Sequence, residues 1–194
     1  MMSIEKHPFE PFLPENARIL FLGSFPPQPH RWCMPFYYPN WINDFWRIMG
    51  LIHFGDRDHF CLPGEKRFDE PAIRAFCTAE GLAFYDTATE ISRLRDNASD
   101  AFLEVVTPTD IPALLARIPH CRHIVVTGEK AAQTLAATLG CPPPPVGAYI
   151  DVVISTKAEG RVEKSLRLWR MPSTSRAYPL PLKQKAAAYR LLWP

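Results

Sequence analysis

Short apolar runs alternate with amphipathic segments along the chain, and this alternation restricts the possible folds more than any other feature of the sequence. Strand-like runs are predicted at residues 17–23, 82–85, 123–127 and 166–171. Helical spacing of apolar residues predicts helices at 43–52, 70–79, 110–118, 129–139 and 182–192. Because parallel strands need crossover connections, this order favours an α/β fold with a mostly parallel sheet covered by helices on both faces.

Local signals mark some ends of these elements. Thr109 is placed to N-cap the helix at 110–118, and Gly140 to end the helix at 129–139. Residues 149–155 are also strand-like, although the sequence does not predict their pairing partner. At 194 residues the chain is long enough to bury one sizeable core. We therefore expect a single domain spanning residues 1–194.

The cysteines and histidines do not form a metal-binding pattern. Five cysteines are scattered along the chain without a C-x-x-C pair, which argues against a disulfide framework, a zinc ribbon or an iron–sulfur cluster. His120 and His123 are three residues apart, but only Cys121 accompanies them, and its side chain would point to the opposite face of a strand. We expect neither a metal nor a cofactor, and structural roles for both histidines.

The sequence shows no targeting or membrane segment. Acidic residues and prolines occupy the N-terminus, where a signal peptide would have an apolar core. No apolar run approaches the roughly 20 residues of a membrane span. These features predict a cytoplasmic protein without membrane contact, which we expect to be a monomer.

Charge is distributed unevenly along the chain. From residue 161 onward there are eight Lys or Arg residues and one acid, whereas residues 1–160 carry 14 basic and 19 acidic residues. The C-terminal segment therefore has a formal charge of +7, and the remainder −5. Such asymmetry indicates that one end contacts a polyanion. A solvated helix face beside an edge strand is the alternative, and both interpretations remain open.

Polar and aromatic residues follow each of the four predicted strands, where ligands bind in parallel α/β sheets. The segments concerned are residues 23–27, 86–89, 127–130 and 171–178. Together they offer a flat aromatic surface, hydrogen-bonding groups and three hydroxyls beside an arginine. The Walker and G-x-G-x-x-G phosphate loops are absent from the sequence, as is the G-x-S-x-G elbow of serine hydrolases.

Three motifs at these strand ends carry a family resemblance. LGSFPP (22–27), FYYPNWINDFW (36–46) and MPSTSRAY (171–178) resemble the uracil-DNA glycosylase superfamily, and specifically its hypoxanthine-DNA-glycosylase-like branch. GLAFYDTATEISRLRDNASD (81–100) supports the similarity, which runs in the family's order from about residue 19 to about residue 178. The resemblance implies a three-layer α/β/α fold with a four-stranded, mainly parallel central sheet. It also implies an enzyme that flips a damaged base out of DNA and cleaves its N-glycosidic bond without a metal.

The resemblance suggests Asn43 as the catalytic residue. Many relatives place a catalytic Asp or Asn where this chain has Phe25, and the hypoxanthine-like branch shares the Phe and is thought to rely on an Asn of the later N-x-F-W element. Asn43 matches that Asn and would orient the water or the base. The alternative is an Asn that satisfies local backbone groups at a helix start. Asp44 is a second polar candidate, although an acid in a first helical turn is ordinary.

Four residues are candidates for holding the base. Phe25, Tyr37 and Tyr38 would stack on it, and stacking contributes about 1–3 kcal/mol per base. The alternative is that Phe36, Tyr37 and Trp41 belong to the core. Asp86 would accept the N1–H of hypoxanthine or the N3–H of uracil, because an ionised carboxylate only accepts hydrogen bonds. Its alternative role is to cap a following helical turn.

The last motif and the basic tail are candidates for DNA contacts. In the resemblance, Ser173, Thr174 and Ser175 form the loop that pinches the DNA backbone, and Arg176 with Ala177 lies where relatives insert a wedge. Met171 stands where many relatives have a catalytic His or Asn. Phosphate contacts are expected from four basic residues: Arg170, Arg176, Lys183 and Lys185.

Three functions follow from these observations. The leading hypothesis is a DNA-repair glycosylase that removes a deaminated base. The second is a non-catalytic module on the same fold that binds damaged or single-stranded nucleic acid. The third is an enzyme acting on a free nucleoside or nucleobase.

Overall fold

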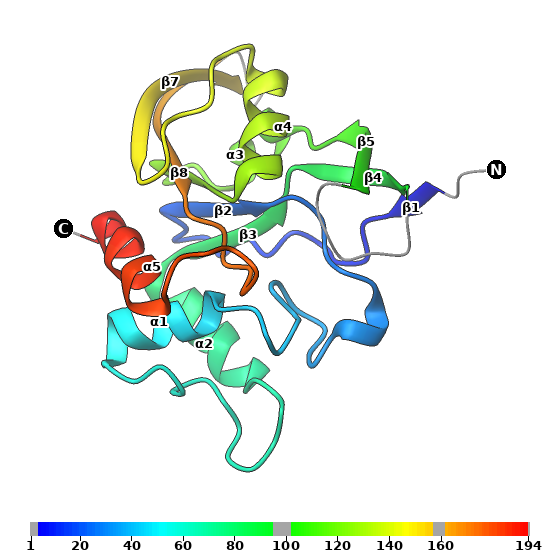
Figure 1. The fold of residues 1–194 in the computed structure, drawn as a ribbon. Helices are drawn as coiled ribbons and strands as arrows, with labels where there is room; N and C mark the ends of the chain where they lie inside the picture. The colour runs from blue at the N-terminus through cyan, green and yellow to red at the C-terminus, as the bar shows by residue number, and fades with distance from the viewer. Residues whose placement is uncertain (1–3, 95–101, 157–161, 194) are drawn as a thin grey trace.

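The computed structural model describes residues 4–94, 102–156 and 162–193. Its larger sheet has five strands in the order β3-β2-β6-β8-β7 (Figure 1). The bounds are β2 Ile19–Gly23, β3 Leu82–Asp86, β6 His123–Thr127, β7 Ala148–Thr156 and β8 Val162–Met171. Strands β3, β2, β6 and β8 are parallel to one another, whereas β7 pairs antiparallel with β8. The predicted parallel strands are thus confirmed, and the run at 149–155 is an additional edge strand.

Helices cover both faces of this sheet, which gives the three layers that were predicted (Figure 1). On one face lie α1 Phe45–Phe54, α2 Glu70–Glu80 and α5 Leu182–Tyr189, and on the other α3 Ile111–Arg117 and α4 Glu129–Leu139. Short 3₁₀ turns form η1 Pro29–Arg31 and η3 Arg190–Leu192. The helix predicted at 43–52 begins two residues later, and the one at 182–192 ends in η3. Both differences lie at helix ends, where side chains compete for backbone groups.

The ends of α3 and α4 test two capping predictions. The N-cap of α3 is Asp110, whose Oδ1 accepts the Ala113 N–H at 3.0 Å. Thr109 was therefore the wrong cap, because its buried hydroxyl instead donates to the Asp86 carbonyl at 2.6 Å. At the other end, Gly140 ends α4 in the left-handed region, with φ of 67°. That prediction is confirmed, and it rests on the freedom of glycine at positive φ.

A second, antiparallel sheet was not predicted from the sequence. It has the order β1-β4-β5, with bounds β1 Ile4–Lys6, β4 Ala88–Arg93 and β5 Leu103–Pro108. Strand β4 begins two residues after Asp86 ends β3. The alternative role of Asp86 as a helix cap is therefore wrong, because a strand follows it. Residues 95–100, the end of the motif at 81–100, lie outside the described residues.

Buried aromatic rings fill the core between the larger sheet and the layer of α1 and α2. Phe84 on β3 is fully buried and stacks on Phe21 and Tyr37, with ring centroids 5.4 and 5.7 Å apart. A smaller cluster around Phe25, Ile91 and Leu103 joins β4 and β5 to the loop after β2. The segment after β2 is thus held between two apolar clusters. Within the described residues, no helix is long and apolar enough to cross a membrane.

The larger sheet has a topological switch point beside β2. From β2 the chain passes through α1 and α2 to β3 on one side, and later enters β6 on the other side. In open α/β sheets, ligands bind beyond the carboxyl ends of the strands at such a point. The ends concerned are Gly23, Thr127 and, on the next strand, Met171.

Candidate active site

A pocket of about 860 Å³ opens at the carboxyl ends of the parallel strands. It brings together most of the residues that the sequence indicated: Phe25, Tyr37, Tyr38, Asn43, Asp86, Ser173, Thr174, Ser175 and Arg176. Lys183 is exposed on α5 and does not line it. Among the described residues, no cluster of three His, Cys, Asp or Glu side chains could hold a metal ion.

The Asp86 carboxylate lies against the backbone of Gly23 on one side of the pocket. A Cβ added at Gly23 would be 2.6 Å from Asp86 Oδ1, closer than real Cβ contacts allow. The two residues are also direct neighbours in the β2–β3 ladder. Glycine is therefore required at this position by the approach of the carboxylate rather than by its backbone angles.

His7 is the partner of Asp86, and sequence reasoning missed it. Its Nε2 lies 2.8 Å from Asp86 Oδ2, and its side chain is 3% exposed. The residue follows β1, and its backbone N–H donates to the Thr89 carbonyl at 2.8 Å. No pattern in the first ten residues signals this contact, because it depends on the small sheet that folds β1 onto β4.

The two tyrosines have different environments. Tyr37 is 3% exposed and its hydroxyl donates to the Glu10 carbonyl at 2.9 Å. Burial, with Asp86 nearby, raises the pKa of Tyr37 far above its usual value. Tyr38 has a positive φ of 53° and stacks on Phe45, with centroids 3.9 Å apart and the rings 2° from parallel. Tyr37 is thus mainly a core residue that reaches the pocket, as the alternative interpretation held.

One face of the Tyr38 ring is covered by Phe45, so a ligand cannot stack on that face. The Tyr38 hydroxyl is 2.7 Å from Thr127 Oγ1, which ties the ring to the end of β6. Phe25 is mostly buried and meets the His7 ring edge-to-face, with centroids 5.2 Å apart. Both rings line the pocket from fixed positions.

The Asn43 side chain caps a backbone N–H at the start of α1, one residue ahead of the N-cap residue Asp44, and it also lines the pocket. Its Oδ1 accepts the Phe45 N–H at 2.9 Å, which is the local role considered as an alternative. This bond assigns the oxygen, and hence the nitrogen, of the side-chain amide. Among the described residues, no acceptor binds the Asn43 Nδ2 group. The amide nitrogen can therefore donate to a bound molecule without breaking the cap.

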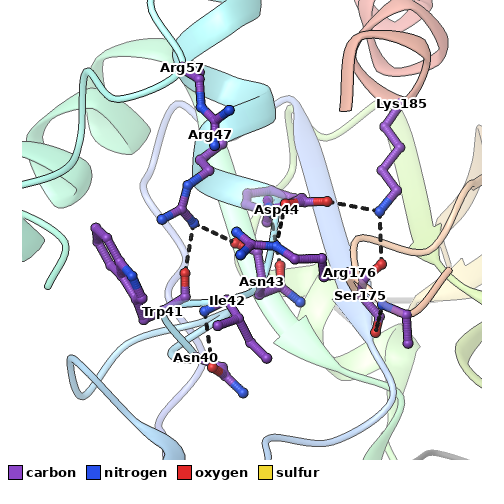
Figure 2. Close-up of polar contacts among 12 residues, drawn as sticks. Asn40, Trp41, Ile42, Asn43, Asp44, Arg47, Arg57, Ser175, Arg176 and Lys185 are labelled. Atoms are coloured by element: carbon purple, nitrogen blue, oxygen red, sulfur yellow. Dashed lines mark hydrogen bonds and ion pairs between the residues drawn. The ribbon is translucent and has the colours of Figure 1, made fainter. Parts of the chain in front are cut away.

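Arg47 fixes the loop that carries Asn43, and it was not among the predicted site residues. Its Nη1 donates to the carbonyls of Trp41 at 2.7 Å and Asn43 at 3.1 Å, and its guanidinium lies 4.4 Å from the Trp41 ring centroid (Figure 2). The side chain is buried, and this burial lowers its pKa. Its place one helical turn after Asn43 is the signal that could have revealed it.

Asp44 joins three parts of the structure (Figure 2). Its Oδ2 accepts from Lys185 Nζ at 2.9 Å, its Oδ1 lies 3.6 Å from Arg176 Nε, and its backbone N–H donates to the Thr174 carbonyl at 2.9 Å. Lys185 is only 1% exposed and also donates to the Ser175 carbonyl at 2.8 Å. The expectation that Lys185 contacts phosphate is therefore wrong, because its ammonium is buried in this network.

The loop after β8 is ordered by its own hydroxyls. Ser173 Oγ accepts the Ser175 N–H at 3.2 Å, and Ser175 Oγ accepts the Ala177 N–H at 3.3 Å. Arg176 remains about half exposed, with 49% of its side chain accessible. The buried Tyr189 hydroxyl donates to the Pro172 carbonyl at 2.8 Å. Arg176 thus lines the pocket from a fixed loop, with its guanidinium near Asp44 (Figure 2).

The pocket wall carries more positive than negative side chains. Four basic residues line it, Arg31, Lys130, Arg170 and Arg176, against two acidic residues, Asp86 and Glu129. Arg170 has a buried Nε without a hydrogen-bond partner among the described residues. An excess of positive charge in the pocket lining suits an anionic ligand.

Comparison with known proteins supports the fold. No protein-family profile and no curated protein matches this sequence. Among solved structures, the chain is similar to the solution NMR structure of a "putative Uracil DNA glycosylase" from Methanosarcina acetivorans. The identity is 22%, the match covers 98% of this chain and 99% of that one, and the TM-score is 0.59. Over almost its whole length, this chain therefore has the α/β fold of that structure.

Proposed function

We propose that this protein is a monofunctional DNA glycosylase that removes a deaminated base, hypoxanthine or uracil, from DNA. The observation that supports this most directly is the composition of one pocket, where Asp86, the Asn43 amide and the Phe25 and Tyr38 rings line the same cavity as four basic side chains. The fold shared with the Methanosarcina acetivorans structure agrees with it.

Each part of the pocket matches a step of base excision. Arg176 and the loop at 173–175 would contact the DNA backbone, while the flipped base would enter between the aromatic residues. Deamination turns an unprotonated ring nitrogen of adenine or cytosine into an N–H donor. An ionised carboxylate only accepts hydrogen bonds, so it can bind this N–H but not the unprotonated nitrogen. Asp86 would therefore favour the deaminated base over its parent.

The chemical step would depend on positioning rather than on a strong base. Water adds to C1′ of the sugar, the N-glycosidic bond breaks with its electron pair on the base, and the water proton finally resides on the base. Neither Phe25 nor Met171 can accept that proton. Asn43 would hold the water or the base, so most of the acceleration would come from orientation and from stabilising the positively charged sugar.

The test is a panel of duplex and single-stranded oligonucleotides carrying uracil, hypoxanthine, xanthine or a mismatch, assayed for abasic sites under enzyme excess. We expect excision of at least one deaminated base, and its loss in Asn43→Ala. Asn43→Asp keeps an oxygen that can cap Phe45 but lacks the amide donor, so it separates the capping role from the catalytic one. Asn16→Ala, which removes an asparagine remote from the pocket, is the matched control.

A binding module without catalysis is the second candidate, and the absence of an acid, amide or imidazole at Phe25 and Met171 favours it. In that case the oligonucleotides would bind in a salt-sensitive manner. Binding without abasic sites from any substrate would select this function over the first. Turnover of free nucleosides without dependence on Arg176 would instead select an enzyme of nucleoside metabolism.

A further inference from the structure

The contact between His7 and Asp86 is a buried hydrogen bond and not an exposed surface pair. Both side chains are nearly excluded from solvent, at 3% and 10% exposed, and their atoms are 2.8 Å apart. Burying a carboxylate is costly unless a donor is supplied. Here the only described side chain that donates to the carboxylate is His7, and it takes Oδ2. No described group donates to Oδ1, the oxygen beside Gly23.

The His7 ring is held from several directions. Four aromatic rings surround it: those of Phe9, Phe25, Tyr37 and Tyr85, with centroid distances from 4.5 to 6.3 Å. Two of these rings, Phe25 and Tyr37, also line the pocket, whereas His7 itself does not. His7 therefore stands directly behind the pocket wall and reaches the pocket only through Asp86.

The second ring nitrogen of His7 meets both a donor and an acceptor on Phe9. Nδ1 lies 3.1 Å from the Phe9 nitrogen and 2.9 Å from the Phe9 carbonyl oxygen. Nδ1 can accept from the N–H while Nε2–H donates to Asp86, or, in the doubly protonated ring, donate to the carbonyl. Donation to Asp86 is thus possible in both states. In the second state the pair has no net charge, which reduces repulsion of a departing anionic base.

We propose that His7 is a positioning residue for the base-reading carboxylate. By holding Oδ2, it turns Oδ1 of Asp86 toward the pocket as an acceptor for a ring N–H next to a carbonyl. The bases selected are those that gain such an N–H on deamination, hypoxanthine and uracil. This role rests on the proposed glycosylase function, and it assigns part of the substrate selection to a residue outside the pocket.

The test compares single-turnover excision of hypoxanthine with that of 1-methylhypoxanthine, in which a methyl group replaces the N1 proton. The wild-type enzyme is expected to prefer hypoxanthine. In His7→Phe, which keeps a ring but loses the donor, excision of hypoxanthine should slow about 10- to 100-fold, the value of a hydrogen bond to a charged group. The preference over the methylated base should collapse, and the same collapse is expected in Asp86→Ala. The dissociation constant for the oligonucleotide should change little.

His7→Gln retains an N–H donor and should restore much of the preference. Glu5→Gln weakens the ion pair between β1 and Arg93, which is 2.9 Å long, without touching Asp86. It controls for loosening of the N-terminal strand, and His7→Leu replaces His7→Phe if thermal denaturation shows that the latter unfolds.

The possible outcomes separate the two proposals. Normal hypoxanthine preference in a folded His7→Phe, or an equal loss in Glu5→Gln, would overturn the role of His7 and leave the glycosylase function standing. No abasic site from any deaminated base with wild-type enzyme in excess would overturn the function and the role of His7 together.

Discussion

The Lys185 ammonium donates to the Asp44 carboxylate across 2.9 Å, so that α5 is joined to the residue that precedes α1. Both side chains are buried, and the Asp44 backbone also binds the loop after β8. The position of Asn43, next in the chain, therefore depends on a contact with a residue 141 positions away from Asp44.

Replacing Lys185 should be strongly destabilising. Lys185→Met leaves the Asp44 carboxylate buried with only the partly exposed Arg176 nearby, and breaking a buried pair costs about 3–5 kcal/mol. Urea denaturation would measure the unfolding free energy. Lys183→Met, on the same helix but exposed, should change it by less than about 0.5 kcal/mol. A similar small change in Lys185→Met would show that the pair contributes little.

Gly23→Ala should disturb the base-reading carboxylate. The new Cβ would stand 2.6 Å from Asp86 Oδ1, and Asp86 cannot withdraw without leaving His7. We expect a loss of about 1–3 kcal/mol in unfolding free energy, as for other overpacked sites. In the double variant Gly23→Ala/Asp86→Ala the two losses should not add, because the clash is gone. Additive losses in denaturation experiments would contradict the close approach.

Arg176 and Lys183 should each contribute to DNA binding, from different places on the surface. Arg176 lines the pocket, whereas Lys183 lies outside it. If each contacts one phosphate, each Ala variant should reduce the slope of log binding constant against log salt by about one. Fluorescence anisotropy over a salt series gives this slope. Arg117→Ala, on the opposite helical layer, should leave it unchanged, and an unchanged slope in Arg176→Ala would exclude a phosphate contact there.

His123 should make stability depend on pH. Its Nδ1 accepts the Trp169 indole N–H at 3.1 Å. Burial and, to a smaller extent, the positive charge of Arg167 lower the pKa of His123. Because the folded pKa lies below the unfolded value of about 6.5, the unfolded state binds more protons, and stability falls as the pH drops through that value. His123→Gln should lessen the loss of unfolding free energy between about pH 7.5 and pH 5.5. His120→Gln, at an exposed position, should not.

The sequence predicted the larger sheet well because β2, β3 and β6 are apolar runs ended by glycine or polar residues, as in ILFLG at 19–23, and the buried part of β8 alternates polar and apolar residues. The small sheet could not be found in this way. Strand β1 has three residues, and β5 is largely exposed, so neither shows a hydrophobic pattern. Strand β4 directly follows β3, and the sequence offers no turn signal between them.

The candidate site was predictable where its residues belong to the sequence motifs and line the pocket. It was unpredictable where residues support the pocket without lining it. Asn43, Asp86 and Ser173 follow from motif position, and the pocket brings them together. Lys185 looked like a surface cation because it lies in the basic C-terminal segment, two residues after the exposed Lys183, and only tertiary packing buries it. His7 and Arg47 depend on contacts with backbone or side chains that periodicity does not describe.

The pairing of β1 with β4 matters for how the protein is prepared. A version shortened to begin at residue 10 would keep every strand of the larger sheet and every residue lining the pocket, yet would lose the histidine behind Asp86. Activity assays should therefore use protein that retains β1 and His7.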